Sequence, residues 1–326
     1  MARPAKHNAG VIGLGLIGSR VAANLRKSGY QVWVWSRTPR PEPNFLSSAA
    51  EVAESAKIIQ IFVSDGEALL QTVRAMSAAL TPEHIILNHA TVSPAETVAA
   101  AEIVHGRHAK YLDAPFTGSR DAAEASQLAF YIGGDAAALE KARAQLEINA
   151  KAIIPIGEVG QAAAMKIAMN MVVALSVGAF AEAMCLVEKS GIPLYKIGEV
   201  FPYHIANSPL VDLKVPGMIK GDFDPRFSLK HMFKDIQIAL AMASEYGVDL
   251  PETAAYAGSA MSGLQNGWGD LDFSSIARHY GYPNEDNEVP EQLFGTSSAP
   301  ASTNGASAAP APVKEKRKIF PLFGPK

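Results

Sequence analysis

Hydrophobic and polar positions follow two different periods along this chain, and the change comes near residue 157. Before that point, short apolar runs rich in β-branched residues alternate with alanine-rich stretches that have helical spacing. Strands alternating with helices are typical of βαβ units, which build a parallel, doubly wound sheet. The pattern predicts strands at 10–13, 31–35, 58–63, 85–87 and 153–156.

Beyond that point the apolar spacing is helical, and no convincing strand pattern remains. It predicts one long helix over 160–190, ended by Gly191 and Pro193. Further helices are expected over 228–246 and 252–267. The second half of the chain is therefore expected to form an all-helical domain.

The end of the chain is rich in serine, alanine and proline, a composition typical of disorder. Its last segment, "KIFPLFGPK", has apolar groups behind a basic cluster, and either a solvated tail or a docking peptide fits that pattern. The expected fold is an α/β Rossmann domain with a mostly parallel sheet, joined by a long helix to an all-α domain. The predicted boundaries are 1–159, 160–282 and, for the tail, 283–326.

Composition and charge argue against several classes of protein, namely nucleic-acid-binding, disulfide-linked, metal-binding and membrane-spanning proteins. The net charge of −3 offers no basic field for nucleic acid or an anionic membrane. The single cysteine, Cys185, excludes an intrachain disulfide, and the eight histidines show no metal-ligand spacing. The longest apolar run, 171–187, contains Glu182, so a buried helix is expected rather than a membrane span. We expect a cytoplasmic protein without a metal.

The stretch "GVIGLGLIG" holds glycines in G-x-G-x-x-G spacing between a strand pattern and a helix pattern. In that context the spacing predicts a dinucleotide site. Gly13 permits a tight turn, Gly15 lets the backbone approach a pyrophosphate, and Gly18 lets helix and strand pack closely. The loop expected to contact the cofactor consists of Gly13, Leu14, Gly15, Leu16, Ile17 and Gly18.

The second predicted strand ends in Ser36, Arg37 and Thr38. A site that prefers NAD usually has an acidic residue there, which binds the ribose 2′-hydroxyl. Arg37 can instead pair with a 2′-phosphate, helped by the two hydroxyl groups. We therefore expect NADP(H) in preference to NAD(H).

The apolar segment "GQAAAMKIAMN" contains two polar residues, Lys166 and Asn170. They are four residues apart, so they share one face of the predicted long helix. Either this face is solvated or it lines a site that needs an ammonium and a carboxamide together.

Four blocks in this order resemble the β-hydroxyacid dehydrogenase family. They are "GLGLIGSRVAANLRKSGYQVWVWSRT", "DAPFTGSRDAAEASQLAFYIGGD", "GEVGQAAAMKIAMN" and "FKDIQIAL", and together they span about residues 10–282. The resemblance implies an active site between a Rossmann domain and a helical domain. It also implies that subunits associate through the helical domain, as a homodimer or homotetramer.

The resemblance assigns roles to individual residues. Lys166 matches the catalytic lysine and Asn170 its partner. Thr117 and Gly118, with the adjacent Ser119, match the segment that binds the substrate carboxylate. The residues implied at the cofactor, besides the glycine loop and the end of the second strand, are Val63, Ser64, Thr91 and Lys234.

Several positions depart from the family pattern. Thr117 replaces a serine but keeps the hydroxyl, Ala162 replaces a glycine, and Ile17 replaces a methionine. Ser119 and Arg120 stand where the hydroxyisobutyrate branch has two glycines. This segment is more similar to the glyoxylate and succinic semialdehyde reductase branch.

The leading hypothesis is NADP(H)-dependent reduction of a small aldehyde or keto acid that carries a carboxylate, with Lys166 as proton donor. Oxidation of a β-hydroxy acid such as 3-hydroxyisobutyrate is the nearest alternative. Lys166 argues against an imine reductase, and Lys166 with Asn170 argues against a non-catalytic NADP-binding scaffold. His204 and His231 could line a substrate cleft, but a surface or core role is favoured for both.

Overall fold

The structure is a computed structural model that describes residues 7–281, which lie in one compact unit. All strands of the described residues fall before residue 158. They are β1 (Asn8–Ile12), β2 (Gln31–Trp35), β3 (Ile58–Ile61), β4 (Ile85–Asn88), β5 (Lys110–Asp113), β6 (Phe116–Thr117), β7 (Leu128–Gly134) and β8 (Ala150–Gly157). The predicted tail, 283–326, lies outside the described residues.

The strands form one sheet in the order β2-β1-β3-β4-β5-β7-β6, with β8 paired to β7. Strands β1 to β5 pair in parallel, so their carboxyl ends meet at the same edge. Strand β7 runs antiparallel to β5 and β6 and parallel to β8. The prediction of a doubly wound, mostly parallel sheet is confirmed.

The predicted strand list lacked β5, β6 and β7. Strand β6 has two residues, and β7 ends in Gly133 and Gly134, of which Gly134 has φ of 121°. Strand β5 has a charged residue at each end, Lys110 and Asp113. None of the three has a long β-branched run, so pairing with neighbours decides their conformation more than local propensity does.

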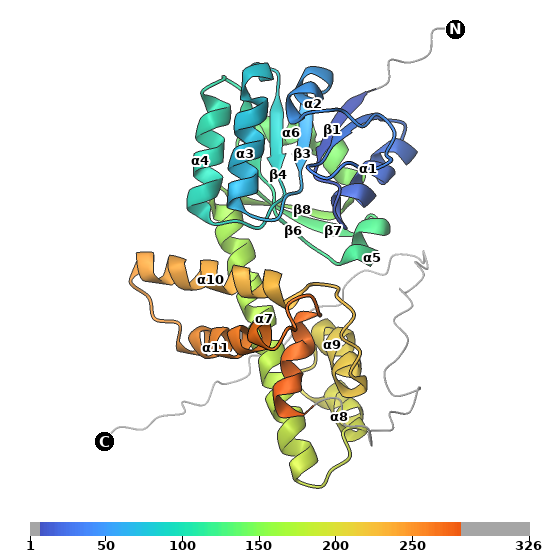
Figure 1. Cartoon of the computed structure of the whole chain (residues 1–326), viewed down its shortest axis with the longest axis vertical. Helices are drawn as coiled ribbons and strands as arrows, with labels where there is room; N and C mark the ends of the chain where they lie inside the picture. The colour runs from blue at the N-terminus through green and yellow to red at the C-terminus, as the bar shows by residue number, and fades with distance from the viewer. Residues whose placement is uncertain (1–6, 282–326) are drawn as a thin grey trace, which may run out of the picture. The chain divides into compact units, whose positions relative to one another are not determined.

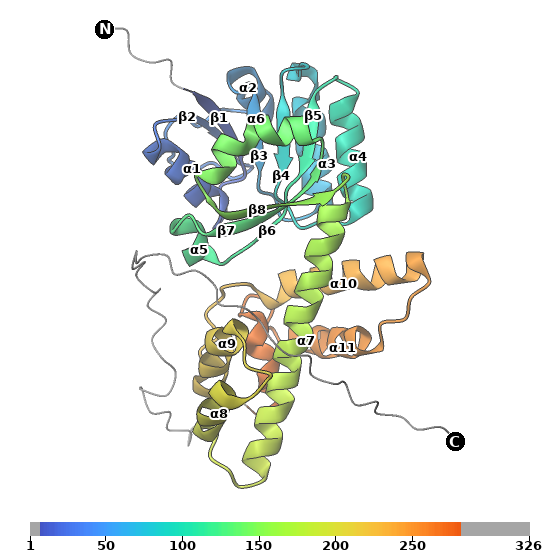
Figure 2. The ribbon, with the colours of Figure 1, turned by 180° about the vertical axis from the view of Figure 1, so that it is seen from behind.

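Helices cover both faces of the sheet (Figures 1 and 2). Helices α2, α3 and α4 pack on one face through side chains such as Val52, Leu69 and Val104. Helices α1 and α6 pack on the other through Leu25 and Leu146. The bounds are α1 (Gly18–Lys27), α2 (Ala49–Ser55), α3 (Gly66–Met76), η1 (Ser77–Ala79), α4 (Pro94–His105), α5 (Arg120–Glu124) and α6 (Ala136–Glu147).

The remaining described residues form the predicted helical domain, which has its own core around Val177, Met218 and Ile236. Helix α7 runs from the sheet into this domain (Figure 2), and Gly191 follows it at φ of 77°, as its predicted end requires. The bounds are α7 (Gln161–Lys189), α8 (Tyr195–Val200), η2 (Phe201–Tyr203), α9 (Pro209–Lys220), α10 (Leu229–Tyr246), α11 (Pro251–Gln265) and η3 (Phe273–Tyr280).

Helix α7 differs from the expectation in one respect. It contains Glu182, yet by length and composition it is apolar enough to cross a membrane. Only 22% of an apolar 18-residue window of this helix is buried, so α7 is not the fully buried helix that the sequence predicts. One side of α7 carries the domain core, and the other leaves apolar side chains exposed.

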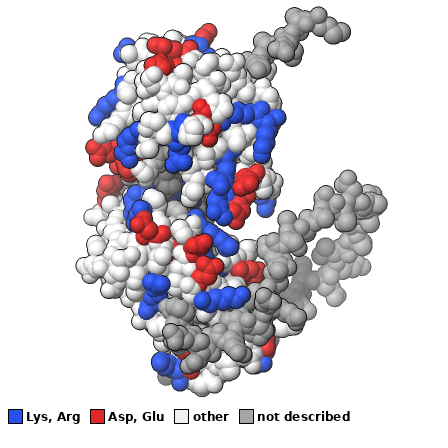
Figure 3. Space-filling view, turned by 45° about the vertical axis from the view of Figure 1, so that its right-hand side comes forward, with Lys and Arg blue, Asp and Glu red and all other residues white. Residues whose placement is uncertain are grey.

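Charges of both signs are interspersed over the face of the molecule in Figure 3. On that face of the described residues, no large area of a single sign appears. This distribution agrees with the net charge of −3.

Asp113 connects the sheet to helix α7 through two hydrogen bonds. It ends β5, is fully buried, and its Oδ2 accepts hydrogen bonds from the backbone N–H of Gly160 at 3.1 Å and of Ala163 at 2.8 Å. Oδ2 therefore satisfies two of the N–H groups that the first turn of α7 leaves without helical partners. The burial of Asp113 and these two hydrogen bonds give it a structural role.

We expect Asp113→Ala to lower the free energy of unfolding by about 1–3 kcal/mol, because two buried donors lose their acceptor. Burial raises the pKa of Asp113 from 3.8 to about 7. The folded state then binds this proton more tightly than the unfolded state, so the stabilisation is lost as pH rises from about 4 through about 7. Asp113→Asn keeps an acceptor without the charge, so it should lose less stability between pH 5 and pH 8 than the wild type.

Thermal unfolding of both proteins at the two pH values measures this difference. Asp135→Asn is the matched control, because Asp135 caps α6 at an exposed position and its pKa is lowered by its hydrogen bonds to Ala138 and Lys110. Equal loss of stability in wild type and Asp113→Asn would contradict the prediction.

Candidate active site

The glycine loop has the geometry of a ligand cradle. Gly13 has φ of 92°, and a Cβ there would lie 1.9 Å from the carbonyl oxygen of Phe62. A Cβ at Gly18 would lie 2.0 Å from the carbonyl oxygen of Gly13, which explains why α1 can start so close to β1. A Cβ at Gly15 would meet nothing within 4 Å, so the space beside its backbone is open to a ligand.

A pocket of about 320 Å³ opens beside this loop at the carboxyl edge of the parallel strands. It contains eight of the predicted cofactor residues: Gly15, Leu16, Ile17, Gly18, Val63, Ser64, Thr91 and Lys234. The crevice outside the carboxyl ends of the strands is where doubly wound sheets bind ligands. The residues present thus fit a dinucleotide whose pyrophosphate lies at the N-terminus of α1.

Helix α10 contributes the other wall of this pocket, through Phe227 just before it and His231, Lys234 and Asp235 on it. The Lys234 ammonium donates a hydrogen bond to the carbonyl oxygen of Thr91, on the loop after β4. The same ammonium lies 2.8 Å from Asp235 Oδ1, an ion pair that lacks the alignment of a hydrogen bond. Lys234 therefore connects α10 to the sheet at the pocket.

Asn170, on α7, contacts this wall of the pocket, and Lys166 lies one turn earlier on the same helix. Asn170 Nδ2 donates to Asp235 Oδ2 at 2.6 Å, so the carboxamide is held by an acid on another helix. Lys166 makes no hydrogen bond or ion pair within residues 7–281. Burial lowers its pKa to about 8; the charge of Asp235 opposes this shift, and that of Lys234 adds to it. Neither Lys166 nor Asn170 lines the pocket of about 320 Å³ itself; they adjoin it through Asp235, which does line it. A half-buried ammonium that makes no hydrogen bond or ion pair, next to such a site, is suited to proton transfer.

Other predicted site residues do not line the pocket. Gly13 lies beneath the loop, packed against Phe62, and Leu14 is buried in the sheet core. Thr117 and Gly118 are exposed, and Ser119 accepts a hydrogen bond from Ala122 N as the cap of α5. Phe116 is the residue of that segment that lines the pocket. The substrate role of these three residues stays a prediction.

The end of β2 also lies apart from the pocket lining. Ser36 Oγ donates to the carbonyl oxygen of Thr38 at 2.6 Å, which closes a short turn. Arg37 is exposed and makes no hydrogen bond or ion pair within the described part of the chain. It is close enough to help Ser64 and Ala68 lower the pKa of Asp65, the cap of α3. Its guanidinium is available to a ligand.

The structure adds pocket residues that the sequence did not single out, Phe62, His89, Phe116 and Phe227. His231, for which the sequence favours a surface or core role, lines the pocket. His204 is exposed. Burial lowers the pKa of His89 to about 4, so this ring is neutral. Three of the added residues are phenylalanines, which alone are not a signal of a site, since most phenylalanine side chains belong to cores.

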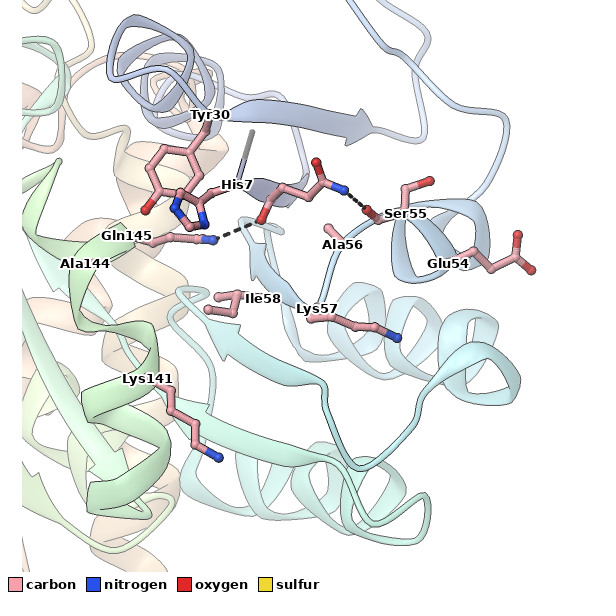
Figure 4. Close-up of a pocket in the computed structure, with 11 residues that line it drawn as sticks. His7, Tyr30, Glu54, Ser55, Ala56, Lys57, Ile58, Lys141, Ala144 and Gln145 are labelled. Carbon is pink, nitrogen blue, oxygen red and sulfur yellow. Dashed lines mark hydrogen bonds between the residues drawn. The ribbon is translucent and has the colours of Figure 1, made fainter. Parts of the chain in front are cut away.

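A second cavity, about 670 Å³, lies at the opposite edge of the sheet (Figure 4). It is lined at the start of β1 by His7 and Asn8, and from α6 by Lys141 and Gln145. Strand amino ends carry neither the glycine loop nor the start of the helix that follows it. Size therefore does not identify the functional pocket here.

Comparisons with known proteins agree with this geometry. Residues 8–157 match the family described as the NAD binding domain of 6-phosphogluconate dehydrogenase. Residues 160–280 match the family described as NAD-binding of NADP-dependent 3-hydroxyisobutyrate dehydrogenase. Both families bind a nicotinamide cofactor.

The chain is 31% identical to glyoxylate/succinic semialdehyde reductase 1 of Arabidopsis thaliana, over 82% of this chain and 96% of the relative. It is 29% identical to 2-hydroxy-3-oxopropionate reductase of Escherichia coli, over 82% and 95%. The solved 3-hydroxyisobutyrate dehydrogenase of Mycobacterium tuberculosis, with L-serine, superposes with a TM-score of 0.77 at 27% identity, over 84% and 99%. The chain therefore belongs to the β-hydroxyacid dehydrogenase family and is an NAD(P)-dependent oxidoreductase that acts on CH–OH groups.

Proposed function

We propose that this protein reduces a small aldehyde or keto acid with NADPH, and that Lys166 donates the proton. The observation that carries the proposal is the Lys166 ammonium, which makes no hydrogen bond or ion pair within the described residues and has a pKa of about 8. The names of two relatives, a glyoxylate/succinic semialdehyde reductase and a 2-hydroxy-3-oxopropionate reductase, supply the candidate substrates.

The residues of this chain have separable tasks in that reaction. The nicotinamide cofactor, when bound, supplies the hydride. As negative charge grows on the substrate oxygen, the Lys166 ammonium stabilises it and transfers a proton from Nζ. Asp235 holds Asn170 at 2.6 Å and thereby fixes the polar face of α7 next to the reacting oxygen. A pKa near 8 keeps Lys166 mostly protonated at neutral pH yet able to release the proton.

Lys166→Ala should lower kcat for aldehyde reduction by about 10²–10⁴-fold, the usual contribution of general acid catalysis, with NADPH affinity unchanged. In the wild type, kcat should fall as pH rises through about 8, because only the protonated lysine donates. The assay follows NADPH absorbance with glyoxylate, succinic semialdehyde, methylmalonate semialdehyde and a cyclic imine.

Lys189→Ala is the control, an exposed lysine at the end of the same helix. Imine turnover that does not depend on Lys166 would reject this mechanism. NADPH binding without turnover of any of these compounds would favour a non-catalytic scaffold. Faster oxidation of 3-hydroxyisobutyrate than reduction of any aldehyde acid would favour the alternative direction.

We also propose NADPH in preference to NADH. The support is that Arg37 is exposed after β2 and makes no hydrogen bond or ion pair in the described residues, with the hydroxyl groups of Ser36 and Thr38 beside it in the sequence. The end of β2, from Trp35 through Thr38, carries no carboxylate that would bind a ribose 2′-hydroxyl.

Arg37→Ala should raise KM for NADPH about 10–100-fold and leave KM for NADH almost unchanged, because only NADPH presents a 2′-phosphate. Arg74→Ala, which removes an exposed arginine of α3, is the matched control. An unchanged KM for NADPH in Arg37→Ala would contradict the cofactor preference.

We further propose that a second copy of the chain covers the exposed apolar side of α7, giving a homodimer or homotetramer. The support is the row formed by Met165, Met169, Val172 and Leu186, of which Leu186 is 71% exposed. Their spacing puts them along one side of the helix. Exposed apolar rows of this kind mark association surfaces.

Leu186→Arg should shift the sedimentation coefficient toward that of the monomer, because it places a charge in the apolar contact. Lys220→Glu, a charge change at an exposed position of α9, should not. A wild type that sediments as a monomer at all concentrations would contradict the proposal.

A further inference from the structure

His231 occupies a position in the pocket that neither the glycine loop nor Lys166 accounts for. It lies on α10 with Lys234 and Asp235, three and four residues further on, so the three share one face of the helix. Its ring lies near parallel to that of Phe227, at 24° and 6.1 Å between centroids. The ring is half-buried and lines the pocket.

One ring nitrogen of His231 is already engaged. Nδ1 lies 2.8 Å from the hydroxyl oxygen of Ser228, a buried residue for which residues 7–281 offer no other side-chain hydrogen bond. A buried hydroxyl needs an acceptor, so we assign the Ser228 proton to this contact and Nδ1 as its acceptor. The ring proton is then on Nε2, which has no partner in the described residues.

The surroundings of His231 favour the neutral form of its ring. Burial lowers the pKa of His231 most, and the charges of Lys230 and Lys234 lower it further. The charges of Asp235 and Asp270 raise it by less. A neutral ring with Nε2–H is a fixed hydrogen-bond donor without a charge of its own.

The other titratable groups of the pocket are occupied. His89 Nδ1 contacts the carbonyl oxygen of Ala114 at 2.7 Å, and its Nε2 contacts Gln60 Oε1 at 3.2 Å. Lys234 donates to the Thr91 carbonyl, and Asp235 accepts from Asn170. Among these groups, His231 Nε2–H is an uncharged donor that a bound molecule can use, besides the remaining N–H of the Lys234 ammonium.

We infer that His231 Nε2–H binds the carboxylate of the substrate. This inference rests on the proposed function, in which the aldehyde oxygen meets Lys166 and the carboxylate is left for another donor. His231 lies on α10 one helical turn before Asp235, which holds Asn170 and whose charge acts on Lys166, so the ring and the ammonium belong to the same site. A neutral donor orients the carboxylate without placing a further cation beside Lys166 and Lys234.

The test compares glyoxylate with glycolaldehyde, which has a hydroxymethyl group in place of the carboxylate. His231→Leu should raise KM for glyoxylate about tenfold or more, leave KM for glycolaldehyde and the Kd of NADPH within about twofold, and change kcat little. His231→Gln, which retains an N–H donor, should restore most of the glyoxylate affinity. His204→Leu, at an exposed position, is the matched control.

A parallel arm with Thr117→Ala addresses the rival position for the carboxylate. If Thr117→Ala raises KM for glyoxylate selectively and His231→Leu does not, the inference is overturned. Equal effects of His231→Leu on both substrates would also overturn it, because they would indicate a structural role.

Binding of malonate to the NADPH complex, measured by calorimetry, separates this inference from the proposed function. A wild type that turns over no aldehyde acid would reject the proposed function alone. Malonate binding that weakens about tenfold in His231→Leu, but not in His231→Gln, would still support the carboxylate site. Absence of malonate binding in such a protein, or binding indifferent to His231→Leu, would reject the site.

Discussion

The buried carboxylate of Asp235 organises the candidate active site. Only 1% of the residue is exposed, yet it accepts a hydrogen bond from Asn170 of α7 and pairs with Lys234, which in turn reaches the loop after β4. Three elements distant in the sequence are thereby held by one acid. A buried charge requires such partners, because an unpaired carboxylate in the interior is strongly destabilising. The negative charge of Asp235 also raises the pKa of Lys166, which opposes the lowering that burial causes.

A second buried acid fixes the start of the same helix. Asp113, at the end of β5, holds the N–H groups of Gly160 and Ala163. Lys166 lies between that anchored first turn and Asn170, which Asp235 anchors. The position of the lysine therefore follows from two carboxylates, one in each domain, while its own ammonium remains free within the described residues.

Buried polar side chains also support the pocket from inside the sheet. His89 contacts Gln60, and Gln60 donates to Gln145, whose amide donates to the carbonyl oxygen of Asn8. The His89 ring stacks on Phe62 at 4.5 Å between centroids, and the Phe62 carbonyl lies against Gly13. Since each buried polar group needs its partner, this chain restricts how the wall beneath the glycine loop can pack.

The sequence by itself determined the fold class, the glycine loop and the polar face of α7, because these depend on local spacing. Gly13, Gly15 and Gly18 lie within six consecutive residues, so their spacing alone predicts the shape of the loop. A spacing of four residues places Lys166 and Asn170 on the same face of a helix. Strands β5 to β7 were not predicted because none of them has a long β-branched run, so pairing with neighbouring strands decides their conformation. Only the tertiary structure decided that Asn170 meets Asp235, that Lys234 reaches Thr91, and that His231 faces the pocket. Those contacts join residues 65 or more positions apart, and no local pattern specifies a pairing at that separation.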